Sequence, residues 1–359
     1  MGYIPMTDNI HARLAKHLDT LHIPFPATES GVEIRILQRW FTKEEADIAL
    51  AMNGYPESVA AIAQRIGKEA AVLAHILEGM SKKGLIFRVA KGDTRLYNIV
   101  PLAEGMWEWH LNTVDQESLH DLSEYMDYFM QKGWYGTPTT QHRIIPVSQS
   151  IDSNMEIMPY EQAEQIIKAQ KKISVAHCIC RKEQRQLGKG CDHLSEVCMA
   201  FGTGAYFYIE NGLGREVTTV EALKILKNGM DSGLVLQPGN GRKVWSLCLC
   251  CGCCCGLLRG LKAMEKPADV AHTNFYCQIT VQECIGCGLC EERCPMDAIS
   301  MDGDTAVVNR DRCIGCGVCV GACNVAAVKL MQKIEQERYI PPKDVTEMQL
   351  RIAGERQRS

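Results

Sequence analysis

The residues best suited to chemistry form two runs of cysteines near the end of the chain. The first run, Cys284, Cys287, Cys290 and Cys294, has the spacing C-x2-C-x2-C-x3-C and is followed by Pro295. Three thiolates in a tight glycine-containing loop can bind three corners of a cubane, and glycines let backbone N–H groups approach the sulfurs. This spacing predicts an iron–sulfur site. A zinc ribbon is the alternative, but zinc usually takes two well-separated pairs of ligands and has no role for a third close cysteine.

The second run, Cys313, Cys316, Cys319 and Cys323, repeats the first 29 residues later. The intervening Ile285, Gly286 and Gly288 recur as Ile314, Gly315 and Gly317, so the segment is an internal duplication. In paired runs of this kind the fourth cysteine of each run binds the other cluster. This rule predicts [4Fe-4S] cluster I on Cys284, Cys287, Cys290 and Cys323. It predicts [4Fe-4S] cluster II on Cys313, Cys316, Cys319 and Cys294.

With these motifs, residues 277–330 resemble the two-cluster 4Fe-4S ferredoxin domain of bacteria. The resemblance covers only this part of the chain and rests on the two cysteine runs. It implies a ferredoxin-like fold that carries electrons one at a time between redox partners, at low reduction potentials. One departure from the pattern is Asn324, which stands where the first run has Pro295.

Two further groups of cysteines lie upstream. The first consists of Cys178, Cys180, Cys191 and Cys198, close in sequence to the cations Arg181, Lys182 and Arg185. Four thiolates can supply all the ligands of a third cluster, and the cations would offset their charge. The alternatives are a zinc site in which His177 or His193 replaces a cysteine, and free buried cysteines. We expect cluster III here.

The second upstream group is a run of six cysteines: Cys248, Cys250, Cys251, Cys253, Cys254 and Cys255. Six cysteines so close together are hard to explain by packing, yet they are too crowded for all six to bind one cubane. We expect a subset to bind a fourth cluster or another metal, with a ligand shared from the first group as one option. Reactive thiol or disulfide chemistry is the alternative. Cys277 stands alone, and we expect it to be structural.

The distribution of the 19 cysteines favours metal binding over disulfides. None lies in residues 1–177, and the start of the chain lacks the basic segment and apolar run of a secretory signal. No apolar stretch approaches the length of a membrane span. In a reducing compartment dense cysteines indicate metal or redox chemistry, so we expect a cytoplasmic protein. The net charge of −4 argues against a dominant basic surface that would bind nucleic acid.

The elements that must position these cysteines predict an α+β multidomain fold. The parts are a leader (1–39), a winged helix-turn-helix-like N-terminal domain (40–100), a connector (101–158), an α/β cysteine-rich middle domain (159–276), a C-terminal two-[4Fe-4S] ferredoxin-like domain (277–330) and a polar tail (331–359). The tail is polar, and its end is expected to be partly disordered because it is terminal.

Capping and turn signals support the N-terminal part of this division. A helix is expected from Ile10 to Leu21 in the leader. Within 40–100, a capping box opens one helix at Thr42, and helices at 59–66 and 68–83 follow. Two strands, 85–90 and 95–100, complete the winged-helix-like pattern.

Periodicity also predicts the elements of the connector and the middle domain. The connector has an amphipathic helix over 117–130 and a strand over 143–147. In the middle domain, helices start at Pro159 and Thr218. Strands are expected at 173–176, 206–208, 234–237 and 244–247.

The cysteine groups supply ligands for several clusters. No sequence motif indicates a substrate pocket. We therefore interpret the chain as a multi-cluster electron-transfer protein, a subunit or partner of an oxidoreductase complex, with redox proteins as donor and acceptor. Whether the chain has enzyme activity of its own stays open, and so does a bound flavin, because flavin sites often lack a local motif. Residues 33–100 contain ten Lys/Arg against eight Asp/Glu, which favours a protein partner or a second copy over DNA.

Two alternative functions are consistent with the same sequence features. The first is a redox- or cluster-sensing transcription regulator that uses the winged-helix-like domain on DNA. The second is an iron–sulfur enzyme with catalysis at an unusual cluster on Cys248–Cys255.

Overall fold

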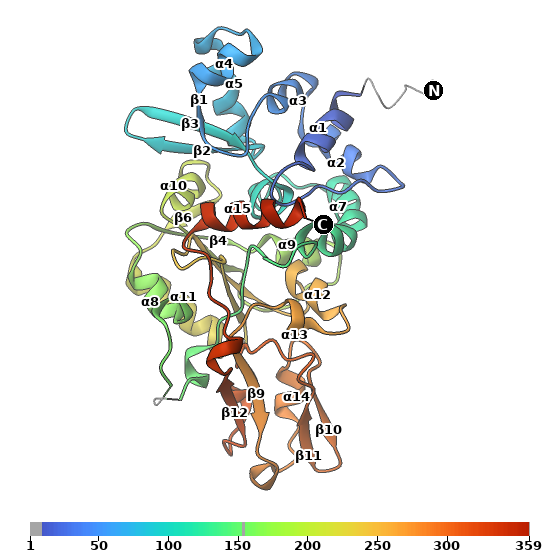
Figure 1. The fold of residues 1–359 in the computed structure, drawn as a ribbon, viewed down its shortest axis with the longest axis vertical. Helices are drawn as coiled ribbons and strands as arrows, with labels where there is room; N and C mark the ends of the chain where they lie inside the picture. Colours follow the sequence, from blue (N-terminus) through green and yellow to red (C-terminus); the bar gives the residue numbers. More distant parts are fainter. Residues whose placement is uncertain (1–8, 153–154, 359) are drawn as a thin grey trace. The chain divides into compact units, whose positions relative to one another are not determined.

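The computed structural model describes residues 9–152 and 155–358, so the expectations for the first eight residues and for Ser359 lie outside the described residues. The chain combines helices and strands, as Figure 1 shows. It divides into two compact units, one of residues 1–137, 206–214 and 352–359 and one of residues 138–205 and 215–351. No helix in the described ranges is long and apolar enough to cross a membrane.

The first unit begins with five helices. They are α1 (Ile10–Leu18), α2 (Val32–Trp40), α3 (Lys43–Leu50), α4 (Val59–Ile66) and α5 (Ala70–Lys82). α3 begins at the predicted capping box, in which the Thr42 hydroxyl accepts from the N–H of Glu45 and the Glu45 carboxylate accepts from the N–H of Thr42. The sequence pattern does not predict α2, which lies in the expected leader and buries Val32, Ile36 and Leu37.

A small antiparallel sheet completes this segment. Its strands are β1 (Glu57–Ser58), β2 (Ile86–Lys91) and β3 (Thr94–Ile99), in the order β1-β3-β2. The helices of 40–100 and the hairpin therefore lie where the sequence predicts them, within two residues at each end. The tight turn between β2 and β3 contains Gly92, which has a positive φ of 58° that glycine adopts without strain.

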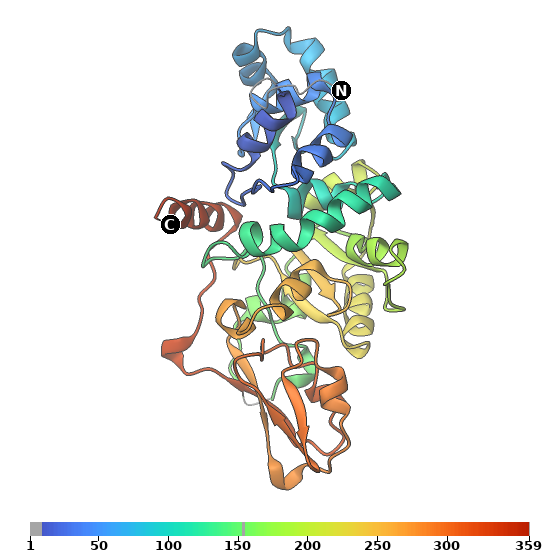
Figure 2. The ribbon, with the colours of Figure 1, turned by 90° about the vertical axis from the view of Figure 1, so that its right-hand side faces the viewer.

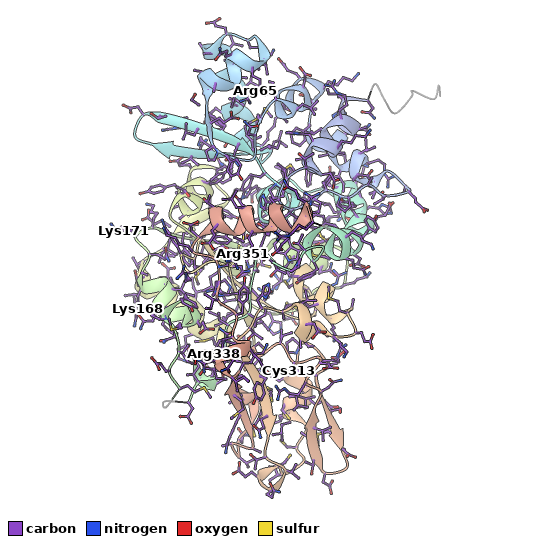
Figure 3. All side chains as sticks on the ribbon, viewed as in Figure 1. Arg65, Lys168, Lys171, Cys313, Arg338 and Arg351 are labelled. Atoms are coloured by element: carbon purple, nitrogen blue, oxygen red, sulfur yellow. The ribbon has the colours of Figure 1, made fainter. Side chains whose placement is uncertain are left out.

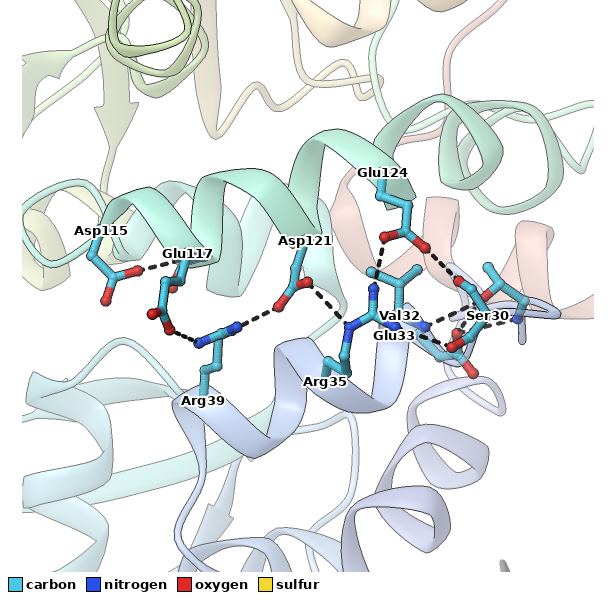
Figure 4. Close-up of polar contacts among 11 residues, drawn as sticks. Ser30, Val32, Glu33, Arg35, Arg39, Asp115, Glu117, Asp121 and Glu124 are labelled. Atoms are coloured by element: carbon cyan, nitrogen blue, oxygen red, sulfur yellow. Dashed lines mark hydrogen bonds and ion pairs between the residues drawn. The ribbon is translucent and has the colours of Figure 1, made fainter. Parts of the chain in front are cut away.

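An ion-pair ladder joins α2 to α7 (Gln116–Phe129), the amphipathic helix predicted for the connector. The buried carboxylate of Asp121 accepts from Arg35 at 3.2 Å and from Arg39 at 2.6 Å (Figure 4). Glu124 and Glu117 extend the ladder at its two ends, the first with Arg35 and the second with Arg39. Because both arginines bind the same buried group, they fix the register of α2 on α7.

Short helical turns and aromatic contacts fill the rest of the first unit. The turns are η1 (Leu102–Met106), α6 (Trp107–Trp109) and η2 (Met130–Trp134). Trp109 packs against Phe87 and Phe207, with ring centroids 5.6 and 4.5 Å apart. Phe207 belongs to α10 (Thr203–Glu210), so the strand expected at 206–208 is wrong. The aromatic residues there favour a strand by propensity, but Phe207 and Tyr208 are both buried while Tyr206 is half exposed, so burial does not alternate as it does along a strand.

The second unit contains a five-stranded sheet of order β6-β4-β5-β8-β7. The strands are β4 (Ile173–His177), β5 (Glu196–Phe201), β6 (Gly214–Glu216), β7 (Val235–Pro238) and β8 (Ser246–Cys250). The helices of this part are η3 (Ser148–Ser150), η4 (Pro159–Glu161), α8 (Ala163–Lys168), α9 (Ile179–Gln186), α11 (Thr219–Asp231), α12 (Gly256–Lys262) and α13 (Pro267–Val270). In the β5–β8 ladder Cys198 lies opposite Cys248, so the sheet itself joins the two upstream cysteine groups.

Two expectations for this unit differ from the structure. Residues 143–147 form no strand: Ile145 makes an isolated bridge with Leu236, and a second isolated bridge joins the preceding His142 to Gly239. The helix expected from Pro159 is divided into η4 and α8, because Gln162 between them has the extended dihedrals φ −110° and ψ 110°. The strands expected at 173–176 and 234–237 correspond to β4 and β7, whereas the strand expected at 244–247 begins two residues later, as β8, and continues to Cys250.

The two cysteine runs lie between antiparallel strand pairs. β9 (Phe275–Ile279) pairs with β12 (Val328–Gln332), and β10 (Ile299–Asp302) pairs with β11 (Thr305–Val308). Between these strands lie η5 (Val281–Glu283), α14 (Leu289–Arg293) and η6 (Val320–Ala322). The path can be followed in Figures 1 and 2. Each cysteine run thus connects one strand pair to the other, which brings the two runs together.

The tail contains regular structure. It forms η7 (Glu335–Glu337) and α15 (Val345–Arg356), elements that the sequence pattern does not predict. Met348 and Ile352 are fully buried, and the Arg356 guanidinium donates to the carbonyl oxygens of Leu21 and Asp19. The burial of Met348 and Ile352 and the hydrogen bonds of Arg356 stabilise this helix, although the overall composition of the segment is polar.

Candidate metal centres

Four cysteines from the two runs line one cavity. Cys313, Cys316 and Cys319 of the second run meet Cys294 of the first run around about 330 Å³ of space, part of which is open to solvent. They are the four thiols that the sequence predicts for cluster II. Cys277 lines the same cavity. Figure 3 marks the position of Cys313, which lies beside β9.

The duplication extends to the backbone groups that surround the sulfurs. The N–H of Ala306 in β11 donates to Cys284 Sγ at 3.5 Å, and the N–H of Cys277 in β9 donates to Cys313 Sγ at 3.3 Å. Residues 277 and 306 hold equivalent positions in the two repeats. The first sulfur of each run therefore accepts from the strand that precedes the other run. Such donors stabilise a thiolate and a cluster sulfur alike.

Two glycines allow the cysteine loops to approach neighbouring backbone. Gly286 and Gly315 have φ values of +68° and +64°. A Cβ on Gly286 would lie 2.6 Å from the carbonyl oxygen of Asp304, and a Cβ on Gly315 would collide with the carbonyl oxygen of Phe275. Only glycine combines this left-handed conformation with so little space.

The two sets of thiols differ in their exposure. Cys287 is exposed, whereas Cys316 and Cys319 are buried. The backbone N–H of Ala306 lowers the pKa of Cys284 by hydrogen bonding to its sulfur. Burial raises the pKa of Cys316 well above that of an ordinary thiol. The set predicted for cluster I thus includes an exposed thiol, whereas the set predicted for cluster II has two buried thiols and none that is exposed.

A segment that precedes the five-stranded sheet covers the second run. The N–H of Val147 donates to the carbonyl oxygen of Cys316 at 3.0 Å. A Cβ on Gly317 would collide with Ser150 Oγ, so the segment lies directly against the loop. This cover explains why Cys316 is buried although it belongs to a short loop.

Residues 283–327 match the family model of the 4Fe-4S dicluster domain. The free thiols of both runs, the cavity and the N–H donors fit this family, which implies 4Fe-4S clusters and indicates iron–sulfur electron transfer. No curated protein and no solved structure matches the chain. The match covers the dicluster domain and leaves the remainder of the chain to be interpreted from its own geometry.

Outside the dicluster domain, four sulfur atoms converge. The Sγ atoms of Cys191, Cys251, Cys253 and Cys254 all lie within 4.8 Å of one another, and we call these residues the four-thiol group. Cys191 Sγ is 3.5 Å from Cys254 Sγ and 3.8 Å from Cys251 Sγ.

The four-thiol group differs from the grouping that the sequence order predicts. The expectation placed Cys191 with Cys178, Cys180 and Cys198, but Cys191 lies in the loop after α9 and groups with residues after β8. Neither His177 nor His193 belongs to the four-thiol group.

The other upstream cysteines form a second set, which we call the six-thiol group. Its members are Cys178, Cys180, Cys198, Cys248, Cys250 and Cys255. Their thiols interact as a chain, in the order 198, 248, 250, 255, 180 and 178. Among the described cysteines, only the four-thiol group brings three or more sulfurs within 4.8 Å of one another, so the six-thiol group is more open.

Neighbouring groups shift the pKa values of two upstream thiols in opposite directions. Hydrogen bonds with Cys248 and Cys255 lower the pKa of Cys250 to about 6. Burial raises the pKa of Cys253 to about 12. In addition, the Gln237 side-chain amide donates to Cys255 Sγ at 3.6 Å, a contact that the sequence pattern does not predict.

Arg181 is a buried cation beside both groups. Its side chain is 1 % exposed, and its guanidinium donates to the carbonyl oxygens of Leu194 at 2.6 Å and Leu249 at 2.9 Å. Its Nε has no hydrogen-bond partner. Burial disfavours the charged form, yet the thiolates of Cys178 and Cys251 raise the pKa of Arg181 above its ordinary value. Cys178 belongs to the six-thiol group and Cys251 to the four-thiol group, so Arg181 offsets negative charge in both.

The loop of the four-thiol group contacts the dicluster domain. A Cβ on Gly252 would lie 2.9 Å from the carbonyl oxygen of Pro295, the residue after Cys294. Arg312, the residue before Cys313, donates to the carbonyl oxygens of Lys262 and Met296, each at 2.9 Å. The backbone that carries the upstream cysteines is therefore packed against the backbone that carries the second set of dicluster thiols.

Cys277 lies inside the dicluster site, which its isolated position in the sequence does not predict. The expectation for this residue is a structural role, and its Sγ lies 3.7 Å from Cys319 Sγ inside the cavity. The signal that could have found it is the duplication, because Cys277 occupies the position that Ala306 has in the second repeat.

Proposed function

We propose that the chain passes single electrons between redox proteins through the dicluster domain and a further metal centre in the middle domain. The observation that carries this proposal is the close approach of Gly252 to Pro295, which sets the upstream cysteine loop against the neighbour of Cys294. Iron–sulfur clusters supply one-electron uptake and release when they are bound. In this proposal the exposed Cys287 lies at the surface end of the electron path and the buried Cys250 at its inner end.

Within the dicluster domain, we assign the ligands by the crossed pattern. Cys284, Cys287, Cys290 and Cys323 would hold cluster I, and Cys313, Cys316, Cys319 and Cys294 would hold cluster II. The shared cavity of the second four supports this assignment. The N–H groups of Ala306 and Cys277 would stabilise the charge on the first sulfur of each run.

The surface around Cys287 is suited to a redox partner. Ile285 is 66 % exposed and Leu289 40 % exposed, although both are large apolar residues. Glu291 and Glu292, also exposed, follow on α14. An apolar centre with an acidic rim fits a protein whose own surface is basic, because complementary charge speeds encounter and sets orientation.

The six-thiol group is the candidate for the further metal centre. It offers more thiols than one cubane needs, and they are spread too widely for a single ion. Arg181 and the Gln237 amide supply a positive charge and a donor beside these sulfurs. We therefore infer a polynuclear iron–sulfur cluster here, with its ligands drawn from these six residues.

The N-terminal element order resembles a winged helix, and we propose that this part binds protein. Several of its basic side chains are engaged in ion pairs, among them Arg65 with Glu57, Lys68 with Glu44 and Lys83 with Glu45. Val72 of α5 is 51 % exposed, which suits a protein surface better than a phosphate backbone. A subunit of an oxidoreductase complex is the partner that we favour, with a second copy of the chain as the alternative.

The proposal is tested with the full chain, purified without oxygen. Iron and acid-labile sulfide should exceed the approximately eight of each that a dicluster domain holds. Reduction by a one-electron protein donor such as flavodoxin, followed by rapid freezing and EPR, should show dicluster signals before upstream signals.

A variant and its control make the order of reduction decisive. Cys294→Ser should slow the upstream signals, because it removes the thiol next to Pro295. Cys277→Ala, which keeps every proposed ligand, should slow the upstream signals less than Cys294→Ser does. Upstream reduction that is equally fast in Cys294→Ser, or iron limited to the dicluster content, would contradict the proposal.

A further inference from the structure

The four-thiol group is built differently from the other cysteine sites of this chain. Three of its members, Cys251, Cys253 and Cys254, come from the short loop between β8 and α12, and Cys191 comes from the loop after α9. The second loop is held in place by Arg185, which donates to the carbonyl oxygens of Cys191 and His193, each at 3.0 Å. Two separate segments are thus positioned to present four sulfurs to one point.

The spacing of these sulfurs matches a single tetrahedral ion. A tetrahedral ion with metal–sulfur bonds of about 2.3 Å places its four sulfurs about 3.8 Å apart. The Cys191 sulfur lies 3.8 Å from that of Cys251 and 3.5 Å from that of Cys254. The thiolates of a cubane bind separate iron corners, so they must stand further apart to leave room for the cluster's own iron and sulfide.

The dicluster domain provides an internal comparison. Its eight cysteines belong to a segment that matches a family with 4Fe-4S clusters, and no three of their sulfurs are grouped within 4.8 Å in the described chain. The four-thiol group is grouped within that distance. We propose that Cys191, Cys251, Cys253 and Cys254 bind one mononuclear tetrathiolate metal ion, Zn²⁺ or Fe²⁺, and not a cubane. Both ions accept four thiolates in tetrahedral geometry.

Charge supports a mononuclear site as well. A divalent ion with four thiolates carries a net charge of about −2, and its formation releases the thiol protons. Arg181, buried and with an unpartnered Nε, supplies a positive charge next to Cys251. Cys253 is exposed, so the ion can be exchanged from solution without unfolding the chain.

This inference goes beyond the proposed electron transfer and does not depend on it. Cys254 and Cys255 make the distinction testable, because they are adjacent in sequence but belong to different groups. Cys254 Sγ lies 3.5 Å from Cys191 Sγ, whereas Cys255 accepts from the Gln237 amide in the six-thiol group.

The experiment measures zinc, iron and acid-labile sulfide per chain in the full protein, purified without oxygen. We expect Cys254→Ser and the exposed-site variant Cys253→Ser each to lose about one metal ion per chain with no loss of sulfide. Cys255→Ser should keep that ion, and any loss in this variant should be of iron and sulfide together, from the six-thiol group. Zinc or sulfide-free iron at the site would each support the proposal. Loss of iron and sulfide together in Cys254→Ser would overturn it, because that result identifies a cubane.

A second measurement needs no variant. Exchange of the purified protein with Co²⁺ should produce the visible absorption of tetrahedral cobalt with four thiolate ligands, without a change in acid-labile sulfide. A disulfide between Cys191 and Cys254 in protein prepared without oxygen, with no ion released, would also overturn the proposal. Absence of electron transfer in either preparation would refute the proposed function and leave the ion count unaffected.

Discussion

The backbone N–H of Cys277 donates to the sulfur of Cys313 at 3.3 Å, so it links the first repeat of the duplicated segment to the second. The side chain of the same residue points into the cavity of the second thiol set, with its sulfur 3.7 Å from Cys319 Sγ. Ala306 makes the equivalent N–H contact to Cys284 without any thiol. The N–H contact to the first cysteine of the run therefore needs only the backbone of residue 277, and the thiol of Cys277 is not required for it.

Replacement of Cys277 by alanine tests this separation. We expect Cys277→Ala to keep the full iron content, because Ala306 shows that alanine fits the equivalent position, but to shift the potential of one dicluster centre. The shift is expected because the variant removes a thiol beside Cys319. Iron analysis and a redox titration followed by EPR measure the two effects. Loss of about four iron per chain would instead make Cys277 a ligand.

The loop glycines provide a matched pair of variants. Gly288 and Gly315 both have positive φ, but a Cβ on Gly288 meets no atom within 4 Å, whereas one on Gly315 collides with the carbonyl oxygen of Phe275. Gly288→Ala should cost only the left-handed conformation, about 1 kcal/mol. Gly315→Ala should cost more and release iron on mild heating. Thermal release of iron compares the two, and equal behaviour would show that the collision is relieved at no cost.

Arg181 should influence the potential of the six-thiol centre. Reduction adds negative charge, which the buried guanidinium stabilises, so Arg181→Met should lower the midpoint potential by about 60 mV, a tenfold change for a one-electron couple. Arg181→Lys keeps the charge and should cause a smaller shift. A spectroscopic redox titration gives these values. A potential that is identical in wild type and Arg181→Met would show that the charge of Arg181 is offset elsewhere.

The first unit should lose stability in acid through His110. Burial lowers the pKa of His110 to about 4, and its ring stacks on Trp40 with centroids 3.9 Å apart. In the unfolded chain a histidine has a pKa of about 6.5, so between these values the unfolded state binds a proton that the folded state does not. The free energy of unfolding should therefore fall as pH falls through this window, by about 2 kcal/mol at pH 5.

His110→Phe checks the origin of this pH dependence. Phenylalanine can stack on Trp40 but does not titrate, so the variant should flatten the change in stability between pH 7 and pH 5. Native-state hydrogen exchange of the backbone around α6 measures the local free energy in the full chain. An equally steep dependence in the variant would assign the effect to other groups of the first unit.

Local spacing was sufficient to predict those parts of the site whose metal ligands lie within one short segment of the chain. The repeated C-x2-C-x2-C-x3-C run indicates the dicluster domain because three cubane ligands and the glycines between them lie within seven residues. The helices and hairpin of 40–100 follow from caps and turns for the same reason. Local pattern was misleading at α10 and α15, where burial of a few side chains overrides propensity and polarity.

The sequence by itself therefore determined that this chain is rich in metal-binding cysteines and ends in two 4Fe-4S runs. Only the tertiary structure decided how the upstream cysteines are divided. Cys191 meets Cys254 although 63 residues separate them, and the pairing of β5 with β8 places Cys198 opposite Cys248. Neighbours such as Cys254 and Cys255 face different groups, because a tight loop turns successive side chains in different directions. Sequence order carries no record of that direction, which is set by the strands and loops on either side.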